Sequence, residues 1–445
     1  MFWTDCTRKQ KPENYSRKGP PPVMHSVTST ARFLFSRATR RFGRSAHGSS
    51  KYASARGPDL DALSRHIILP SMPVTDEELA RATFQDRGLR MARQEMWEEL
   101  SDHIQEADHG RITTPGGESA AMLLAFGARS DVVAVVEDML HDGAAPSPGG
   151  IDALEAVAQE HPGAYPIQLV VALAHIDLAW AWHSIPAAAT LEGAAERCAA
   201  HAGRADDLLS GQCGLALDAP SLAAAQCALL GAAPDLRDPR QARVADHFED
   251  LIDLDPVSPR HMRALGAALL PARLGSYAEL ELEARRTAAR TGATWGAGAY
   301  AWVYFDALAL DSGALALLDP AFFVDGLRDI LRHRPDQHTV NLLAAFCAVT
   351  MRDRAEVPRT GRTAQGALHD CLTWILRDHM HELHPLIWTQ ALHRPGAAPL
   401  PSRRALITEG RRTALRAIAA QFADDIAGGH SIAFSPAGMY LLPSL

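Results

Sequence analysis

DALEAVAQEHP (residues 152–162) recurs in this chain as DHFEDLIDLDP (residues 246–256) and again as DGLRDILRHRP (residues 325–335). Each copy has an aspartate ten residues before its final proline and large apolar residues eight and five residues before it. Internal repetition is strong evidence of architecture, because each copy is expected to form the same structural unit. The repeat indicates how the chain is built and says little about its chemistry.

The final proline of each copy predicts the end of a helix. Proline cannot donate a backbone amide and disfavours helical geometry in the residue before it. Each copy is therefore predicted to form a helix, a tight stop and a second helix. The segments after the prolines are apolar at helical spacing and carry a small residue about ten positions on, namely Ala172, Gly266 and Ala345. Small residues at such positions let neighbouring helices approach closely.

Spacing and composition predict the fold class. The copies lie 94 and 79 residues apart, which leaves room for one further helical hairpin in each interval, over residues 198–230 and 277–310. The 445-residue chain is 47% hydrophobic, enough for a packed core. Abundant alanine and few β-branched or aromatic runs favour helices over strands. We predict an all-α fold of roughly fourteen to eighteen helices, stacked as antiparallel pairs into an α-solenoid with almost no sheet.

One copy resembles a tetratricopeptide repeat. The similarity begins at Pro256 and continues with Leu265 and Gly266, which resemble the leucine-glycine pair in the first helix of such a repeat. Gly275, Tyr277 and Ala278 then resemble the turn into the second helix. The other copies lack the Leu-Gly pair, so the similarity is divergent and covers at most residues 150–355. The resemblance implies a right-handed solenoid that binds a peptide on its concave face. There the matching first-helix positions are Arg260 and Arg263, two guanidiniums able to hold a peptide carboxylate.

Charge and loop composition divide the chain into four regions. Residues 1–58 hold twelve basic and two acidic residues, a net charge of +10, which leaves −18 for the rest of a chain whose net charge is −8. We expect a disordered basic arm at 1–58, an N-terminal helical segment at 59–145, tetratricopeptide-like repeats at 146–355, and a C-terminal helical region with a short apolar tail at 356–445. The arm's pattern also suits an organelle transit peptide or a membrane-surface anchor.

Local signals predict helix boundaries in the N-terminal segment. Thr75 followed by Glu78 fits a capping box, and apolar residues recur at helical spacing as far as Gly110. This stretch is predicted to be one long helix or two helices with a break near Gly88. The sequence TTPGG at residues 113–117 then predicts a loop.

A histidine-rich stretch is the main candidate for metal chemistry. The sequence DHMHELH places His379, His381 and His384 close to Glu382, and imidazole and carboxylate are ligands for zinc or iron. On one helix, however, His381 and His384 would share a face and His379 would diverge from them. HELH is also one residue short of the HExxH motif. With twenty histidines in the chain, composition is the stronger explanation of the cluster.

A second candidate is the aromatic segment TWGAGAYAWVYF, residues 294–305. It contains Trp295, Tyr300, Trp302 and Tyr304, whose rings would cover a helix nearly all round. Such a helix is either a central core helix or the aromatic wall of a peptide groove. Its glycines do not form a GxGxxG motif, so a nucleotide site is not predicted.

These patterns favour a non-enzymatic helical-repeat scaffold that binds a protein or peptide and uses no cofactor. The acidic body repels nucleic acid, and no apolar run is long enough to cross a bilayer. Six widely spaced cysteines without a CxxC pair are typical of free thiols in a reducing compartment, which predicts a cytoplasmic protein. The rival hypothesis is a helical metal protein or enzyme that uses the His369–His384 stretch. A third is a ligand-binding domain built around the aromatic segment. The oligomeric state is left open.

Overall fold

The computed structural model describes residues 60–232, 243–352, 359–393 and 401–443. Helices make up most of the described chain, which confirms the all-α prediction. The described residues contain nineteen α-helices, numbered α2 to α20, and three short strands. The basic arm predicted for residues 1–58 lies outside the described residues. None of the described helices has both the length and the apolar character needed to cross a membrane.

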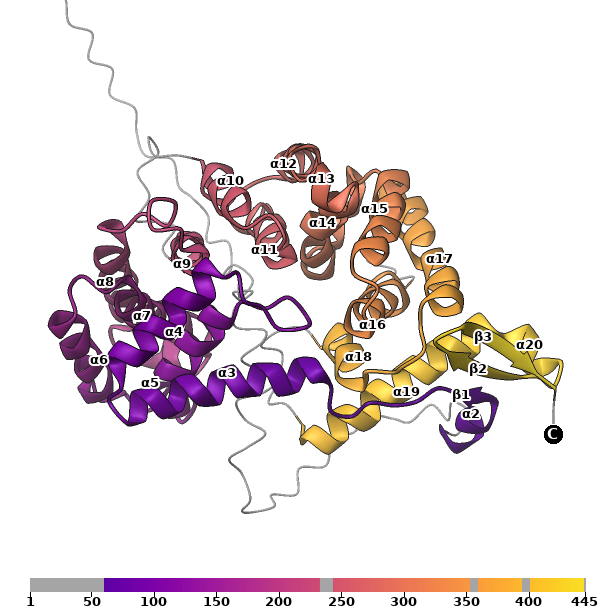
Figure 1. The fold of residues 1–445 in the computed structure, drawn as a ribbon, viewed down its shortest axis with the longest axis horizontal. Coiled ribbons are helices and arrows are strands. Elements are labelled where there is room, and N and C mark those ends of the chain that lie inside the picture. The colour runs from indigo at the N-terminus through magenta and orange to yellow at the C-terminus, as the bar shows by residue number, and fades with distance from the viewer. Residues whose placement is uncertain (1–59, 233–242, 353–358, 394–400, 444–445) are drawn as a thin grey trace, which may run out of the picture.

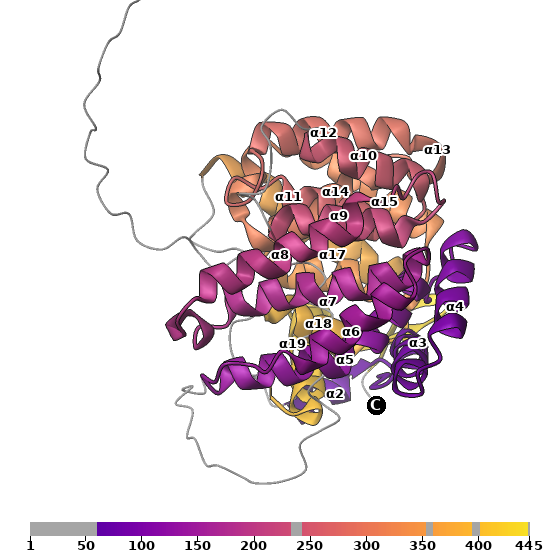
Figure 2. The ribbon, with the colours of Figure 1, turned by 90° about the vertical axis from the view of Figure 1, so that its left-hand side faces the viewer.

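The first half of the chain forms a helical group around α7, on the left in Figure 1. Figure 2 shows α5, α7 and α9 one above another, and α7 contacts both of the others. Nearly every residue of α7 is buried, including His175, so it forms the centre of this half. The helices of this group are α3 (Asp76–Arg93), α4 (Trp97–His109), α5 (Ala120–His141), α6 (Gly149–Glu160), α7 (Tyr165–Ser184), α8 (Ala194–Ser210) and α9 (Pro220–Ala232). The short helix α2 (Leu60–His66) lies apart from this group, on the right in Figure 1.

The second half continues as paired helices across the top and down the right side of Figure 1. Its core is continuous from α10 to the C-terminal strands. The elements are α10 (Val244–Leu254), α11 (Pro259–Ala268), α12 (Tyr277–Arg290), α13 (Gly292–Trp295), α14 (Gly298–Leu310), α15 (Pro320–His333), α16 (Gln337–Ala345), α17 (Arg362–Asp378), α18 (Pro385–Leu392), α19 (Arg403–Gln421) and α20 (Ala423–Ala427).

The three proline units form the predicted helix, stop and second helix. The first helices are α6, α10 and α15, and they end at Glu160, Leu254 and His333, each two residues before the proline. In every copy, the amide of the residue before the proline donates to the carbonyl five residues before the proline. This bond closes the last turn, and the proline prevents a further one. The second helices, α7, α11 and α16, begin two or three residues after the prolines.

The repeated aspartate has no common role. Asp152 lies in the first turn of α6, and the Asp246 carboxylate accepts from the amide of Arg243 at the start of α10 (2.8 Å). Asp325 instead lies inside α15, whose N-cap is Asp319. The aspartate therefore does not mark the helix start in the third copy, where Pro320 starts the helix earlier.

The predicted capping box is present, but the predicted helix break is misplaced. The Thr75 hydroxyl accepts from the amide of Glu78 (3.3 Å), and the Glu78 carboxylate accepts from the amide of Thr75 (3.2 Å). The stretch divides into α3 and α4 after Arg93, while Gly88 lies inside α3. A Cβ at Gly88 would lie 2.1 Å from the Leu124 carbonyl oxygen of α5. Gly88 therefore serves close packing of α3 on α5 and does not interrupt α3.

The predicted close approach at Gly266 is confirmed. A Cβ at Gly266 of α11 would lie 1.7 Å from the Val303 carbonyl oxygen of α14. Gly410 of α19 is equally close to the Pro385 carbonyl oxygen of α18, at 1.8 Å. Glycine thus fixes the crossing of two helix pairs in the second half of the chain.

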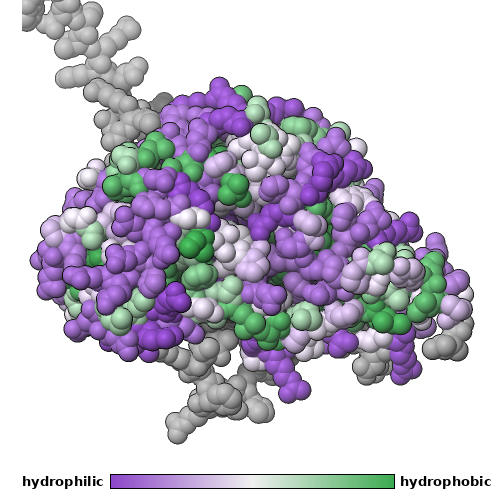
Figure 3. Space-filling view, viewed as in Figure 1, coloured by the Kyte–Doolittle hydropathy of each residue, from purple (hydrophilic) through white to green (hydrophobic). Residues whose placement is uncertain are grey.

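A small sheet joins the two ends of the described chain. The strand β1 (Ile67–Ile68) pairs in parallel with β2 (Ser431–Ser435), which pairs with β3 (Gly438–Leu442) in an antiparallel hairpin. The C-terminal region was expected to be helical with a short apolar tail, and this tail is the β2–β3 hairpin. Its β-branched and aromatic residues, with Gly438 at φ +118°, favour the hairpin over another helix. In Figure 3, hydrophobic side chains gather on the surface over this sheet.

Candidate functional site

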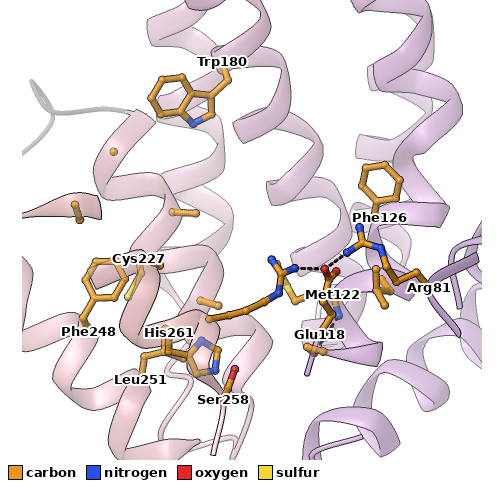
Figure 4. Close-up of a pocket in the computed structure, with 18 of the residues that line it drawn as sticks. Arg81, Glu118, Met122, Phe126, Trp180, Cys227, Phe248, Leu251, Ser258 and His261 are labelled. Carbon is orange, nitrogen blue, oxygen red and sulfur yellow. Dashed lines mark hydrogen bonds and ion pairs between the residues drawn. The ribbon is translucent and has the colours of Figure 1, made fainter. Parts of the chain in front are cut away.

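A cavity of about 240 Å³ lies where the two halves meet. Residues of α3, α5, α7 and α9 line it from the first half, and residues of α10 and α11 line it from the second. Cavities of this kind, with apolar walls and a few convergent polar groups, are the common form of ligand sites. Figure 4 shows this cavity with the side chains that line it.

Most of the cavity wall is apolar. Phe126 of α5 and Trp180 of α7 lie on the first half, and Phe248 and Leu251 of α10 face them from the second. Phe248 and Leu251 are two of the repeated apolar positions, and both also belong to the buried core. The indole nitrogen of Trp180 is buried and has no hydrogen-bond partner among the described residues. The wall therefore provides apolar contact and one unused donor.

The charged lining residues are four arginines and one glutamate. Glu118, just before α5, forms ion pairs with Arg81 of α3 and with Arg260 of α11 (Figure 4). The side chains of Arg81 and Glu118 are about nine-tenths buried, whereas that of Arg260 is 34% exposed. Burial lowers the pKa of Arg81, and the nearby carboxylates of Glu77 and Glu78 partly offset this effect.

Of the two remaining arginines, Arg129 is buried and Arg273 is half-buried. Arg129 of α5 donates to Asp177 of α7 at 2.7 Å, and its guanidinium lies 5.4 Å from the centre of the Phe126 ring. Burial lowers the pKa of Arg273, and the charge of Asp306 acts in the opposite direction. The cavity thus combines an apolar wall with more cationic than anionic side chains, which is the lining that an apolar anion requires.

The loop between α4 and α5 places Glu118 next to Arg81 and Arg260. The Thr114 amide donates to the Glu118 carbonyl (2.9 Å), and the Glu118 amide donates to the Thr114 hydroxyl (3.0 Å). Gly117 has φ +81°, a conformation that glycine adopts without strain. These features confirm the loop predicted from TTPGG. Sequence reasoning had not identified Glu118 or Arg81 as site residues.

The predicted arginine pair divides between two environments. Arg260 is among the residues that line the cavity. Arg263 instead donates to both carboxylate oxygens of Asp306 (3.1 and 2.7 Å) and covers the ring of Phe305. The two guanidiniums therefore have different partners, Glu118 for Arg260 and Asp306 for Arg263.

The aromatic segment lies in the core, where Trp295 ends α13 and the other three aromatic residues belong to α14. Trp295, Tyr300, Trp302 and Tyr304 are all at most 2% exposed. The hydroxyls of Tyr300 and Tyr304 both donate to one carboxylate oxygen of Glu281, each at 2.7 Å, and burial raises the pKa of both hydroxyls. These rings are inaccessible to a partner in this structure, because neighbouring side chains cover both faces of the helix.

The histidine-rich stretch is not helical. His379 follows the end of α17, and His384 precedes Pro385 at the start of α18. The backbone amide of His381 donates to the side chain of Gln337 (2.9 Å), and that of His384 donates to Asn341 (3.0 Å). The helical geometry assumed for the pair His381 and His384 is therefore wrong. Among the described residues, no group of three or more His, Cys, Asp or Glu side chains is placed to hold a metal ion.

His175 is buried and contacts two polar side chains. Its Nε2 lies 2.9 Å from Glu155, and its Nδ1 lies 3.0 Å from Nδ1 of His201. Burial lowers the pKa of His175, and it lowers that of His201 to about 4.

Comparison of the chain with models of protein families, with curated proteins and with solved structures finds no match. The cavity between the two halves is therefore the feature on which a functional hypothesis rests.

Proposed function

We propose that this chain is a non-enzymatic helical-repeat protein that binds a peptide partner, and that the cavity receives an apolar group bearing a carboxylate. The observation that carries the proposal is an apolar cavity whose charged lining is four arginines and one glutamate. The carboxyl-terminal residue of a peptide combines an apolar side chain with a carboxylate. A free apolar acid such as decanoate offers the same chemistry.

Physical reasoning supports this choice of ligand. A carboxylate leaves water at low cost only where charged donors meet it, and a guanidinium can meet it with two parallel hydrogen bonds. Arg260 is the suited donor, because about a third of its side chain is still exposed and the ligand can reach it. Aromatic and aliphatic walls then stabilise the apolar part by removing it from water.

Two finer points belong to the same proposal. The proline-terminated units are divergent relatives of tetratricopeptide repeats, supported by the helix-stop-helix form of all three copies and by the contact at Gly266. The protein acts in the cytoplasm, supported by the free thiols of its described cysteines, Cys198, Cys213, Cys227, Cys347 and Cys371.

The test is a binding titration with matched probes. Calorimetry would compare a short peptide ending in phenylalanine with a free carboxylate, the same peptide with an amidated end, and decanoate. We expect the amide to bind at least tenfold more weakly than the acid, because a charge-assisted bond contributes roughly 1.5–3 kcal/mol. A stronger signal from decanoate than from the peptide acid would identify a free acid as the natural source of the carboxylate.

The structure provides a matched pair of variants for this titration. Arg260→Gln should weaken binding of the acid about tenfold or more and leave the amide unchanged. Arg263→Gln, only three residues away and outside the cavity lining, should bind the acid like the wild type. Equal binding of acid and amide, or an Arg260→Gln protein that binds the acid normally, would refute the proposal.

A further inference from the structure

Glu118 already occupies the position that a ligand carboxylate would take. Its carboxylate lies between the guanidiniums of Arg81 and Arg260 and lines the cavity (Figure 4). The two arginines come from opposite halves of the molecule, α3 and α11, so the carboxylate of Glu118 also links the halves. An acid that entered the cavity would therefore compete with this internal carboxylate for Arg81 and Arg260.

The loop that carries Glu118 does not need this carboxylate to keep its shape. The loop closes through backbone groups and the Thr114 hydroxyl, with the amide of Gly117 donating to the Thr114 carbonyl at 2.9 Å. From outside, Arg334 donates to the Pro115 carbonyl (2.5 Å), and Glu77 accepts from the amide of Gly116 (2.5 Å). The hydrogen bonds that shape the loop therefore do not involve the carboxylate of Glu118.

We propose that Glu118 is a built-in competitor for the ligand, whose carboxylate displaces that of Glu118 from the arginine pair. The inference rests on the proposed function, since it assigns a role to one residue of the same cavity. The exchange of one carboxylate for another preserves the ion pairing of Arg81 and Arg260. Glu118 thus sets the affinity threshold: only an acid that also gains apolar contact with the walls binds better than the internal carboxylate.

This role predicts an unusual gain of affinity on mutation. Glu118→Gln keeps the size of the side chain but removes its negative charge, so the arginines lose their internal partner. The peptide acid should bind at least tenfold more tightly to this variant than to the wild type, and the amidated peptide should bind equally to both. Glu99→Gln, an exposed glutamate of α4, is the matched control and should leave both affinities unchanged.

A second variant tests carboxylate exchange without the peptide. Glu118→Ala leaves space between two guanidiniums, and propionate resembles the missing side chain. Millimolar propionate should raise the thermal unfolding midpoint of Glu118→Ala more than equimolar chloride does, with no such difference in the wild type. Circular dichroism of both Glu118 variants would confirm that their helical content matches that of the wild type.

The outcomes separate this inference from the proposed function. If the wild type binds the acid through Arg260 and Glu118→Gln shows no tighter binding, the competitor role is overturned and the proposed function stands. If propionate stabilises Glu118→Ala but no variant binds the peptide acid or decanoate, carboxylate exchange is supported and the proposed function is overturned. If neither effect occurs, both are overturned.

Discussion

Substitution of Gly266 by alanine should destabilise the protein, although alanine is the better helix former. Gly266 lies in α11, where the added Cβ would lie 1.7 Å from the Val303 carbonyl oxygen and 2.7 Å from its carbonyl carbon. A separation of 1.7 Å is about half of an ordinary contact distance between carbon and another heavy atom. Both atoms belong to the backbone, so α11 and α14 would have to move apart as units.

The two opposing contributions can be compared. Replacement of glycine by alanine within a helix contributes roughly 1 kcal/mol of stability. Overpacking in a core costs typically about 1–3 kcal/mol and sometimes more, and a backbone clash of this size belongs at the upper end. We expect Gly266→Ala to lower the free energy of unfolding by about 2 kcal/mol net.

Gly203 provides the matched control. It lies within α8, and a Cβ there would have no other atom within 4 Å. Gly203→Ala should therefore stabilise the protein by about 0.5–1 kcal/mol, because only the helix propensity changes. Thermal and urea unfolding, followed by circular dichroism, would measure shifts of opposite sign for the two variants. Equal shifts, or a Gly266→Ala protein more stable than wild type, would refute the predicted contact between α11 and α14.

Three further predictions follow from single contacts. Thr75→Ala should cost about 1 kcal/mol in urea unfolding, since it removes the hydroxyl that caps α3; an unchanged midpoint would contradict the capping box. Asp108→Ala should lower the free energy of unfolding by about 2–4 kcal/mol. The Tyr165 hydroxyl and the Ser221 amide donate to Asp108 at 3.1 and 3.0 Å, and both would lose a buried acceptor. A decrease below about 1 kcal/mol would argue against this burial. The lowered pKa values of His175 and His201 mean that the folded state binds fewer protons than the unfolded state, so their contribution to stability is present above pH ~6.5 and lost as pH falls toward 4. Unfolding midpoints measured from pH 7 to 4.5 should therefore fall less in His201→Gln than in wild type, and parallel curves would contradict that assignment.

Local rules explain which parts of the fold were predictable. The ends of α6, α10 and α15 follow from one proline each, and the start of α3 follows from Thr75 and Glu78. These signals act within a few residues, so the sequence contains the whole cause. The role of Gly88 was not predictable in this way, because it depends on the backbone of Leu124, which only the tertiary structure brings near.

The candidate site was less predictable for the same reason. Arg81, Glu118 and Arg260 are distant in the sequence, and each alone is typical of a solvated helix surface or loop. The likeness to a tetratricopeptide repeat identified Arg260, yet it also suggested Arg263, whose charge is balanced by Asp306. Asp253 and Asp255 precede the two arginines closely in the sequence, yet they contact Arg290 and His261 instead. Helical spacing alone does not show which helix will face a given side chain.

Contact between the two ends of the described chain fixes the relative positions of the residues that line the cavity. In an open solenoid each unit contacts only its neighbours, so small bends add up along the array. Here β1 pairs with β2, the amide of Leu383 donates to the Pro70 carbonyl (2.8 Å), and Arg403 pairs with Glu78 at 2.6 Å. These contacts hold the N-terminal end of α3 against the last helices while its C-terminal half packs on α5. Because α3 carries Arg81, the closure fixes the position of Arg81 relative to Arg260 before any ligand arrives. A site whose charged groups are already in place loses less entropy on binding, so weakening of the closure should reduce ligand affinity even where no cavity residue is changed.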